Sequence, residues 1–232
     1  MSVDDSKKAL VLFSGGLDST TTLAYALSKS YNVIALTINY KQRHCYEIEA
    51  SKKIISKYSN VKHIIFDIDL TRIGGSALTD SCIEVPNKSK NGIPITYVPA
   101  RNTIFLSIAS SYAEKYRIRN IFIGVNAVDY SGYPDCRPEF INAYENMINL
   151  GTKAGSEGQT FKIHTPLILL SKSEIIAMGS KLNVNYSDTV SCYSLNDKGE
   201  ACGQCDSCYF RRQGFIDAGI DDPTIYENKS KI

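Results

Sequence analysis

The sequence predicts an α/β fold: a parallel five-stranded sheet with helices on both faces, followed by a small cysteine-bearing segment at the C-terminal end. Two observations predict the sheet. Short apolar runs alternate with segments of helical spacing, as in sheets built from strand–helix–strand units, and a Ser/Gly-rich turn directly follows the first apolar run. A third observation, four closely spaced cysteines after residue 190, predicts the final segment.

The apolar runs give five strands, and a segment with helical character follows each of them. Strands are expected at residues 9–13, 31–38, 61–68, 120–125 and 161–168. Helices are expected at residues 20–27, 47–58, 104–116, 141–151 and 174–182. The last of these helices begins with the capping-box spacing of Ser171 and Glu174. We expect residues 1–186 to form the α/β domain and residues 187–232 to form the cysteine-bearing segment, packed on the same domain.

The composition is that of a soluble globular protein. The chain has 232 residues, of which 43% are hydrophobic and 22% charged, enough to bury one sizeable core. Its formal net charge of +2 gives no reason to expect a nucleic-acid partner. No apolar run approaches the ~20 residues of a membrane span, and the first residues lack the apolar core of a signal peptide. We therefore expect a cytoplasmic protein with no membrane partner.

Residues 13–19, Phe-Ser-Gly-Gly-Leu-Asp-Ser, are the most informative stretch. They join an apolar strand to a helix, and the backbone N–H groups at a helix N-terminus attract anions. The two glycines let a phosphate approach the backbone without meeting a Cβ atom, and the two serines add hydroxyl donors. Asp18 would repel a bare phosphate, so its place here indicates a magnesium ion or a role in orienting the loop.

This stretch lacks the Gly-Lys-Ser/Thr run of the Walker phosphate loop. It resembles instead the pyrophosphate loop (PP-loop) of the N-type ATP pyrophosphatases, whose fold is adenine nucleotide alpha hydrolase-like. The resemblance implies cleavage of Mg²⁺-bound ATP between its α and β phosphates. An ordinary strand-to-helix turn that uses Ser and Gly is the alternative. Carried over onto this chain, the ATP-binding residues are Phe13, Ser14, Gly15, Gly16, Leu17, Asp18, Ser19, Thr20, Thr21, Thr22 and Leu23.

Two cationic side chains stand where a phosphate or carboxylate could bind. Arg101 lies just before an apolar helix, and Lys172 lies at the start of another. On the pattern alone, each could instead be a solvated residue in the first turn of a capped helix. Together with Asp18 and Ser19, these two residues complete the set of candidate catalytic residues.

A Gly/Pro-rich loop at residues 126–140 follows the fourth strand and is the candidate substrate site. Aromatic rings there can stack on a flat heterocycle, and a carboxylate can accept paired N–H donors from a guanine-like edge. We expect Asp135 to be that acceptor, with Asp129 and Glu139 as alternatives. An ordinary surface loop would have a similar composition. The candidate substrate residues are Tyr130, Tyr133, Asp135, Arg137 and Glu139.

Four cysteines near the C-terminus can surround one metal ion: Cys192, Cys202, Cys205 and Cys208. The run Cys202-x-x-Cys205-x-x-Cys208 is too closely spaced for sensible disulfides, and four thiolates suit tetrahedral zinc. An iron–sulfur cluster is the rival occupant, and four unligated cysteines are the remaining alternative. Because four protein ligands leave no position open for water, we expect one structural zinc ion per chain. The cysteines at positions 45, 82 and 136 are expected to be free thiols.

Several motifs occur in one order between residues 8 and 215. They are Phe-Ser-Gly-Gly-Leu-Asp-Ser-Thr-Thr, Val-Pro-Ala-Arg-Asn-Thr, Asp-Tyr-Ser-Gly-Tyr-Pro-Asp-Cys-Arg-Pro-Glu-Phe, Thr-Pro-Leu, and Ser-Cys-Tyr followed by Cys-Gly-x-Cys-x-Ser-Cys. In this order they resemble the 7-cyano-7-deazaguanine synthases, which act in queuosine precursor synthesis. The acid-rich loop and the cysteine spacing carry this resemblance more specifically than the PP-loop, which a whole superfamily shares.

The resemblance implies an ATP-dependent ligase that forms carbon–nitrogen bonds. A carboxylate of 7-carboxy-7-deazaguanine would attack the α-phosphate of ATP, and ammonia, supplied as free ammonium, would displace AMP to give an amide. A second activation, now of the amide oxygen, would lead to the nitrile. The resemblance also implies a homodimer. A tRNA-modifying enzyme with the same PP-loop and a non-catalytic zinc-bearing nucleotide-binding module are the alternatives.

Overall fold

The computed structural model describes residues 7–43, 45–86, 92–126 and 132–227. Five parallel strands form one sheet in the order β3-β2-β1-β4-β5, which confirms the predicted number and direction of strands. The strands are β1 (Lys8–Leu12), β2 (Asn32–Asn39), β3 (Lys62–Asp67), β4 (Asn120–Phe122) and β5 (Lys162–His164).

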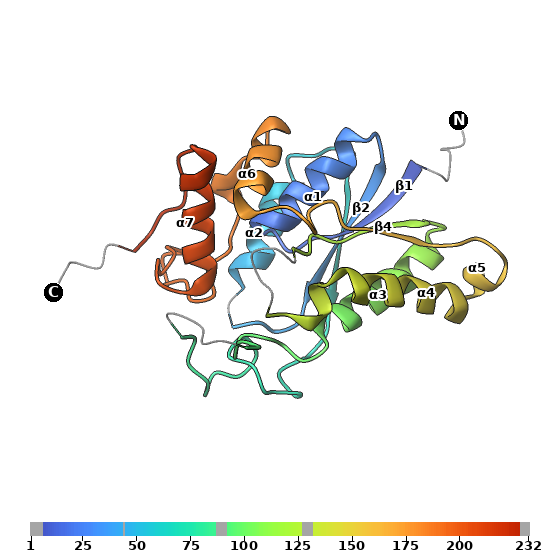
Figure 1. The fold of residues 1–232 in the computed structure, drawn as a ribbon, viewed down its shortest axis with the longest axis horizontal. Helices are drawn as coiled ribbons and strands as arrows, with labels where there is room; N and C mark the ends of the chain where they lie inside the picture. Colours follow the sequence, from blue (N-terminus) through green and yellow to red (C-terminus); the bar gives the residue numbers. More distant parts are fainter. Residues whose placement is uncertain (1–6, 44, 87–91, 127–131, 228–232) are drawn as a thin grey trace.

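Helices cover both faces of the sheet, as predicted (Figure 1). On one face lie α1 (Leu17–Ser28) and α2 (Tyr46–Ile55), and α6 (Lys172–Lys181) and α7 (Asp206–Ala218) pack beyond α1. On the other face lie α3 (Arg101–Lys115), α4 (Pro138–Gly151) and the short α5 (Lys153–Ser156). Two 3₁₀ turns, η2 (Pro134–Cys136) and η3 (Tyr186–Asp188), join these elements.

The central strand β1 is buried on both faces, which explains its unbroken apolar run. Its side chains alternate between the two cores. Leu10 and Leu12 pack in the core under α3 and α4, whereas Ala9 and Val11 pack in the core under α1 and α2. β2 and β4 flank β1 on opposite sides, so the order of the strands along the sheet changes direction at β1. In open parallel sheets, ligands bind at such a point, at the carboxyl ends of the strands.

Helix α7 is an element that the sequence analysis missed. Its Phe215 is buried with Leu17 of α1 and Ile176 of α6. A Cβ atom on Gly214 would lie 2.5 Å from Cγ of Lys172 and 3.0 Å from Cδ1 of Ile176. The contact between α6 and α7 therefore requires a glycine inside α7. This glycine lies in a polar stretch with little apolar periodicity, so the helix has a weak signal in the sequence.

Three helices begin three residues earlier than expected. α1 begins at Leu17 and not at residue 20, α3 begins at Arg101 and not at residue 104, and α4 begins at Pro138 and not at residue 141. A proline in the first turn of a helix lacks only an N–H that would have no partner within the helix. The capping box of α6 is confirmed, because Ser171 and Glu174 exchange both of its hydrogen bonds. None of the helices in the described part of the chain is long and apolar enough to cross a membrane.

Candidate active site

A cavity of about 310 Å³ opens at the carboxyl ends of β1, β2 and β4. Its walls come from the loop after β1, from the first turns of α2, α3 and α6, from η2, and from the segment around the C-terminal cysteines. The volume lies in the range of small-molecule sites. The sheet topology and the cavity thus agree on the place of a ligand site.

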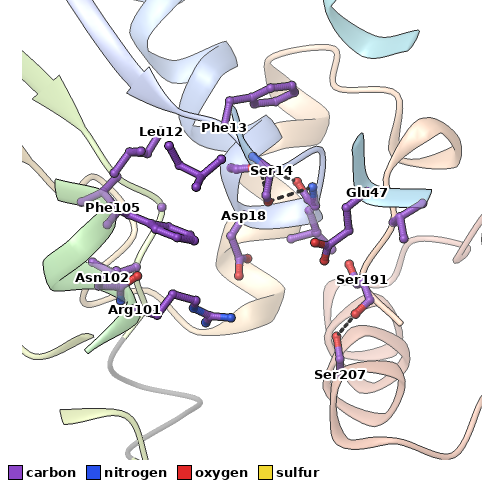
Figure 2. Close-up of a pocket in the computed structure, with 18 of the residues that line it drawn as sticks. Leu12, Phe13, Ser14, Asp18, Glu47, Arg101, Asn102, Phe105, Ser191 and Ser207 are labelled. Carbon is purple, nitrogen blue, oxygen red and sulfur yellow. Dashed lines mark hydrogen bonds between the residues drawn. The ribbon is translucent and has the colours of Figure 1, made fainter. Parts of the chain in front are cut away.

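Six of the eleven residues predicted to bind ATP line this cavity: Phe13, Ser14, Gly16, Leu17, Asp18 and Ser19. The Oγ atom of Ser19 accepts the N–H of Ser14 at 3.2 Å and donates to the carbonyl of Gly16 at 3.1 Å. These bonds fold the chain into a compact turn whose Ser14 side chain is exposed to the cavity (Figure 2).

The other five residues of the predicted ATP set do not line the cavity but support the structure of the loop. The hydroxyls of Thr20, Thr21 and Thr22 donate to carbonyls four residues earlier, and Leu23 is fully buried in the core. Gly15 has a φ of +83°, and a Cβ atom there would lie 2.7 Å from the Ser51 nitrogen. A glycine is therefore needed both for the backbone conformation and for the close approach of α2.

The predicted catalytic residues Asp18 and Lys172 form an ion pair in the cavity. The ammonium of Lys172 donates to both carboxylate oxygens of Asp18, at 2.8 and 2.9 Å. The Lys172 side chain is only 18% exposed, because it reaches from α6 to Asp18 of α1 and packs against Gly214 of α7. Lys172 was expected either to face the loop at residues 13–19 or to be solvated. The structure supports the first of these two positions.

Arg101 is the first residue of α3, and Figure 2 shows it projecting toward the same space as Asp18. Its guanidinium lies 5.9 Å from the ring centroid of Tyr133 and donates a hydrogen bond to the hydroxyl oxygen of Tyr40. Burial disfavours the charged guanidinium of Arg101, but its interactions with Tyr40, Tyr133 and Tyr193 raise its pKa overall, and an arginine is cationic in proteins in any case. Burial also raises the pKa of Tyr40 to about 12, which keeps its hydroxyl protonated.

Asp135, the expected acceptor for the base, contacts the start of α3. Its Oδ2 atom accepts the backbone N–H of Asn102 at 3.0 Å, and its backbone carbonyl accepts the Asn102 side-chain amide at 3.0 Å. Asp135 is only 6% exposed and is not among the residues that line the cavity. It caps α3 from 33 positions away, and this cap explains why α3 begins at Arg101.

The other predicted substrate residues have different locations. Tyr133 lines the cavity, and its hydroxyl lies 3.0 Å from that of Thr96. Arg137 and Glu139 are exposed and do not line it. Tyr130 and Asp129 lie outside the described residues.

The four C-terminal cysteines come together as predicted. All four sulfur atoms lie within 4.8 Å of one another, and those of Cys202 and Cys208 are 3.9 Å apart. Zn–S bonds of about 2.3 Å in a tetrahedron place sulfurs about 3.8 Å apart, so the residues fit a zinc ion. The remaining cysteines are free, as expected, and burial raises the pKa of Cys136 to about 12. Cys136 therefore lines the cavity as a neutral thiol.

Comparison with known proteins agrees with this geometry. A family model described as "Queuosine biosynthesis protein QueC" matches residues 8–219. The chain belongs to the QueC family. It is 55% identical to the 7-cyano-7-deazaguanine synthase of Cupriavidus pinatubonensis and 56% identical to that of Saccharophagus degradans, in each case over 96% of this chain and 99% of the relative.

The fold of this QueC-family chain is also similar to that of the NMN synthetase from Francisella tularensis. The TM-score is 0.51 at 16% sequence identity, over 93% of this chain and 78% of that one. At this identity the likeness shows the fold alone.

The QueC-family cavity includes residues that the sequence analysis missed. Tyr40 follows β2 directly, so the rule that ligands bind at the carboxyl ends of strands could have identified it. Glu47 lies in the first turn of α2, beside the loop of Ser14 (Figure 2). Ser191 and Tyr193 flank Cys192 in the sequence and line the cavity. Nothing in the sequence connects these last two with the loop, because only the fold brings them together.

Proposed function

We propose that this protein uses ATP to convert 7-carboxy-7-deazaguanine and ammonia to 7-cyano-7-deazaguanine, as a ligase of queuosine precursor synthesis. The observation that supports this most strongly is one cavity of a QueC-family chain that combines an anion-binding loop, the Asp18–Lys172 pair and the cationic Arg101. A carboxylate is a poor electrophile, and adenylation gives it a leaving group. Such a reaction needs these charges within reach of one another.

The loop of Ser14 and Ser19 would bind the ATP phosphates through its N–H and hydroxyl groups. Lys172 uses two N–H donors on Asp18, and its third would bind a phosphate oxygen. Asp18 and Glu47 place carboxylates on the cavity wall, and carboxylate oxygens are ligands that Mg²⁺ prefers. A bound Mg²⁺ ion would neutralise part of the charge on the phosphates.

The proposed reaction has two activations. A carboxylate oxygen of the acid bonds to the α-phosphorus of ATP, and pyrophosphate leaves. Ammonia then attacks the acyl carbon and loses a proton, and AMP leaves to give the amide. The amide oxygen bonds to the α-phosphorus of a second ATP with loss of pyrophosphate. Cleavage of the resulting C–O bond releases the second AMP, and loss of both N–H protons leaves the nitrile.

Arg101 would pair with the substrate carboxylate before activation and with the adenylate phosphate afterwards. Tyr133 offers its ring as a stacking surface for the flat base. Asp135 would act from behind the wall, since it holds the turn of α3 that carries Arg101. A water-poor site matters here because water would hydrolyse the acyl-adenylate, and the aromatic wall of Tyr40, Phe105 and Tyr133 would help to exclude it.

We further propose one structural zinc ion on the four cysteines, a homodimer, and free ammonium in the cytoplasm as the nitrogen source. Residues 187–232 are proposed to belong to the same domain as residues 1–186. The shared core of α7, α6 and α1 supports this arrangement, because α7 has its main apolar partners outside its own segment.

An ATP–pyrophosphate exchange assay tests the proposal. With ammonia omitted, labelled pyrophosphate should enter ATP only when 7-carboxy-7-deazaguanine is present. Exchange that requires unmodified tRNA would instead indicate a tRNA-modifying enzyme, and no exchange with either would indicate a non-catalytic module. Arg101→Gln should lower the exchange rate about 100-fold. Arg72→Gln, which removes an exposed arginine outside the cavity, is the matched control.

A further inference from the structure

The segment that leads into the cysteine cluster is hydrogen-bonded to the phosphate loop itself. The N–H of Val190 donates to the carbonyl of Gly15 at 3.1 Å. A Cβ atom on Gly16 would lie 3.2 Å from the carbonyl oxygen of Val190, so the two backbones are in close contact. Cys192 follows two residues later. Only one residue, Ser191, separates the loop's hydrogen-bonding partner from a metal-binding cysteine.

The cysteine cluster contacts this segment from its other side. The hydroxyl of Ser207 donates to the carbonyl of Ser191 at 2.6 Å (Figure 2). Ser207 stands between Cys205 and Cys208 at the start of α7. When the four sulfurs hold a metal ion, Cys192 and the first turn of α7 are fixed relative to one another, and the peptide between Val190 and Cys192 is fixed with them.

Arg211 strengthens the same connection. It is 3% exposed, and its guanidinium donates to the hydroxyls of Thr189 and Ser191, at 2.8 and 3.3 Å, and to the carbonyl of Tyr186 at 3.0 Å. Its Nε atom donates to Asp222 at 3.2 Å, which balances the buried charge. One side chain of α7 thus holds three residues of the segment that ends at Cys192.

We propose that the metal-loaded cysteine cluster positions the phosphate loop, with Val190 as the positioning residue that transmits its geometry to Gly15 and Gly16. This inference rests on the anion-binding role of the loop given in the proposed function. A metal-binding segment that only stabilised the C-terminal part of the chain would need no hydrogen bond to Gly15. The cysteine cluster would therefore support the proposed ATP site indirectly, without contact between its sulfur atoms and ATP.

Hydrogen exchange on the full chain tests the metal's part. The zinc-loaded protein is compared with protein stripped by a chelator and with stripped protein to which zinc alone is returned. Exchange at residues 186–193 and at residues 13–20 should rise on stripping and fall again on reloading, while residues 32–39 of the sheet stay protected. Faster exchange at 186–193 with unchanged exchange at 13–20 would overturn the proposal.

A pair of variants tests Val190 without removing the metal, which also decides the matter if the stripped protein unfolds as a whole. Val190→Pro removes the N–H donor, and the extended backbone of Thr189 (φ −88°, ψ 142°) suits a residue before proline. Val190→Ala removes the two methyl groups of the side chain but keeps the N–H donor. Both should retain one zinc ion per chain. Inorganic pyrophosphate should bind about 3- to 10-fold more weakly to the proline variant than to the alanine variant.

Equal pyrophosphate affinity of the two variants would overturn the positioning role of Val190. This outcome is distinct from a failure of the proposed function. If the zinc-loaded wild-type protein binds pyrophosphate but supports no exchange with the deazaguanine acid, the assigned reaction fails. The hydrogen-exchange comparison then still decides whether the cluster positions the loop.

Discussion

The ammonium nitrogen of Lys172 lies within 2.9 Å of both carboxylate oxygens of Asp18, a residue 154 positions away in the chain. The pair joins the first turn of α1 to the first turn of α6, inside the cavity that the phosphate loop lines. The first turns of both helices therefore line the same cavity. The ion pair holds the Lys172 ammonium and the Asp18 carboxylate at the place where we propose that pyrophosphate leaves.

Removal of either member of this pair should abolish most of the activity. Asp18→Ala and Lys172→Ala are each expected to lower kcat/KM about 100- to 1,000-fold, because each removes a charge beside the transferring phosphate. Ser19→Ala, which removes a loop hydroxyl, should act in the same direction. Lys181→Ala, at the exposed end of α6, is the matched control. Near-normal activity in the Asp18 and Lys172 variants would contradict the assignment of the loop.

The contact of Gly214 with the stem of Lys172 gives a second prediction. Gly214→Ala places a methyl group 2.5 Å from Cγ of Lys172, so α7 or the lysine must move. We expect a loss of stability of about 1–3 kcal/mol and a fall in activity. Gly151→Ala is the control, since no atom beyond its own helix backbone and chain neighbours lies within 4 Å of its Cβ position, and it should be neutral or stabilise the protein by up to about 1 kcal/mol. Denaturant unfolding and steady-state kinetics measure the two effects, and equal behaviour of the variants would refute this packing.

Two substitutions of Asp135 separate a cap from a reader of the base. Asp135→Asn keeps an oxygen that can accept the N–H of Asn102, so the cap role predicts nearly wild-type stability and activity. Asp135→Ala removes the acceptor and should cost about 1–2 kcal/mol of stability. It should also weaken catalysis, because the turn that carries Arg101 loosens. If Asp135 instead accepts paired N–H groups of the base, Asp135→Asn alone should already lower catalytic efficiency strongly while ATP binding is retained.

The cysteine cluster should hold about one zinc ion per chain. Cys205→Ala is expected to lose the metal and to lower the thermal midpoint, since binding energy at such sites is also folding energy. Cys82→Ala, at an exposed free cysteine, should change neither quantity. Elemental analysis and thermal unfolding measure both effects. Iron with visible absorption in anaerobically purified protein would show that the site holds a different metal.

The sheet and the edge at which the cavity opens were predictable from sequence because they depend on local patterns. An unbroken apolar run predicts a strand buried on both faces, and the Ser/Gly turn after β1 predicts an anion site. The capping box at Ser171 was readable for the same reason, since both of its members lie within one turn. The spacing of the four cysteines also predicted their cluster.

Other features depend on contacts between distant parts of the chain. The cap on α3 comes from Asp135, and no local signal marks Asn102 as its partner. Helix α7 was missed because the contact with α6 requires a glycine at position 214, and the surrounding residues show little apolar periodicity. The contact between Val190 and Gly15 exists only because the fold returns the C-terminal segment to the first loop. In each case a tertiary contact, and not local propensity, decides the role of the residue.

The most direct test of the proposed reaction is a product balance. The purified protein is incubated with 7-carboxy-7-deazaguanine, ATP, Mg²⁺ and ammonium, and the products are quantified by mass spectrometry and chromatography. The account predicts 7-cyano-7-deazaguanine, with AMP and pyrophosphate each formed twice for every nitrile, and with the amide as the intermediate. Release of ADP and phosphate in place of AMP and pyrophosphate, or the absence of the nitrile, would contradict it.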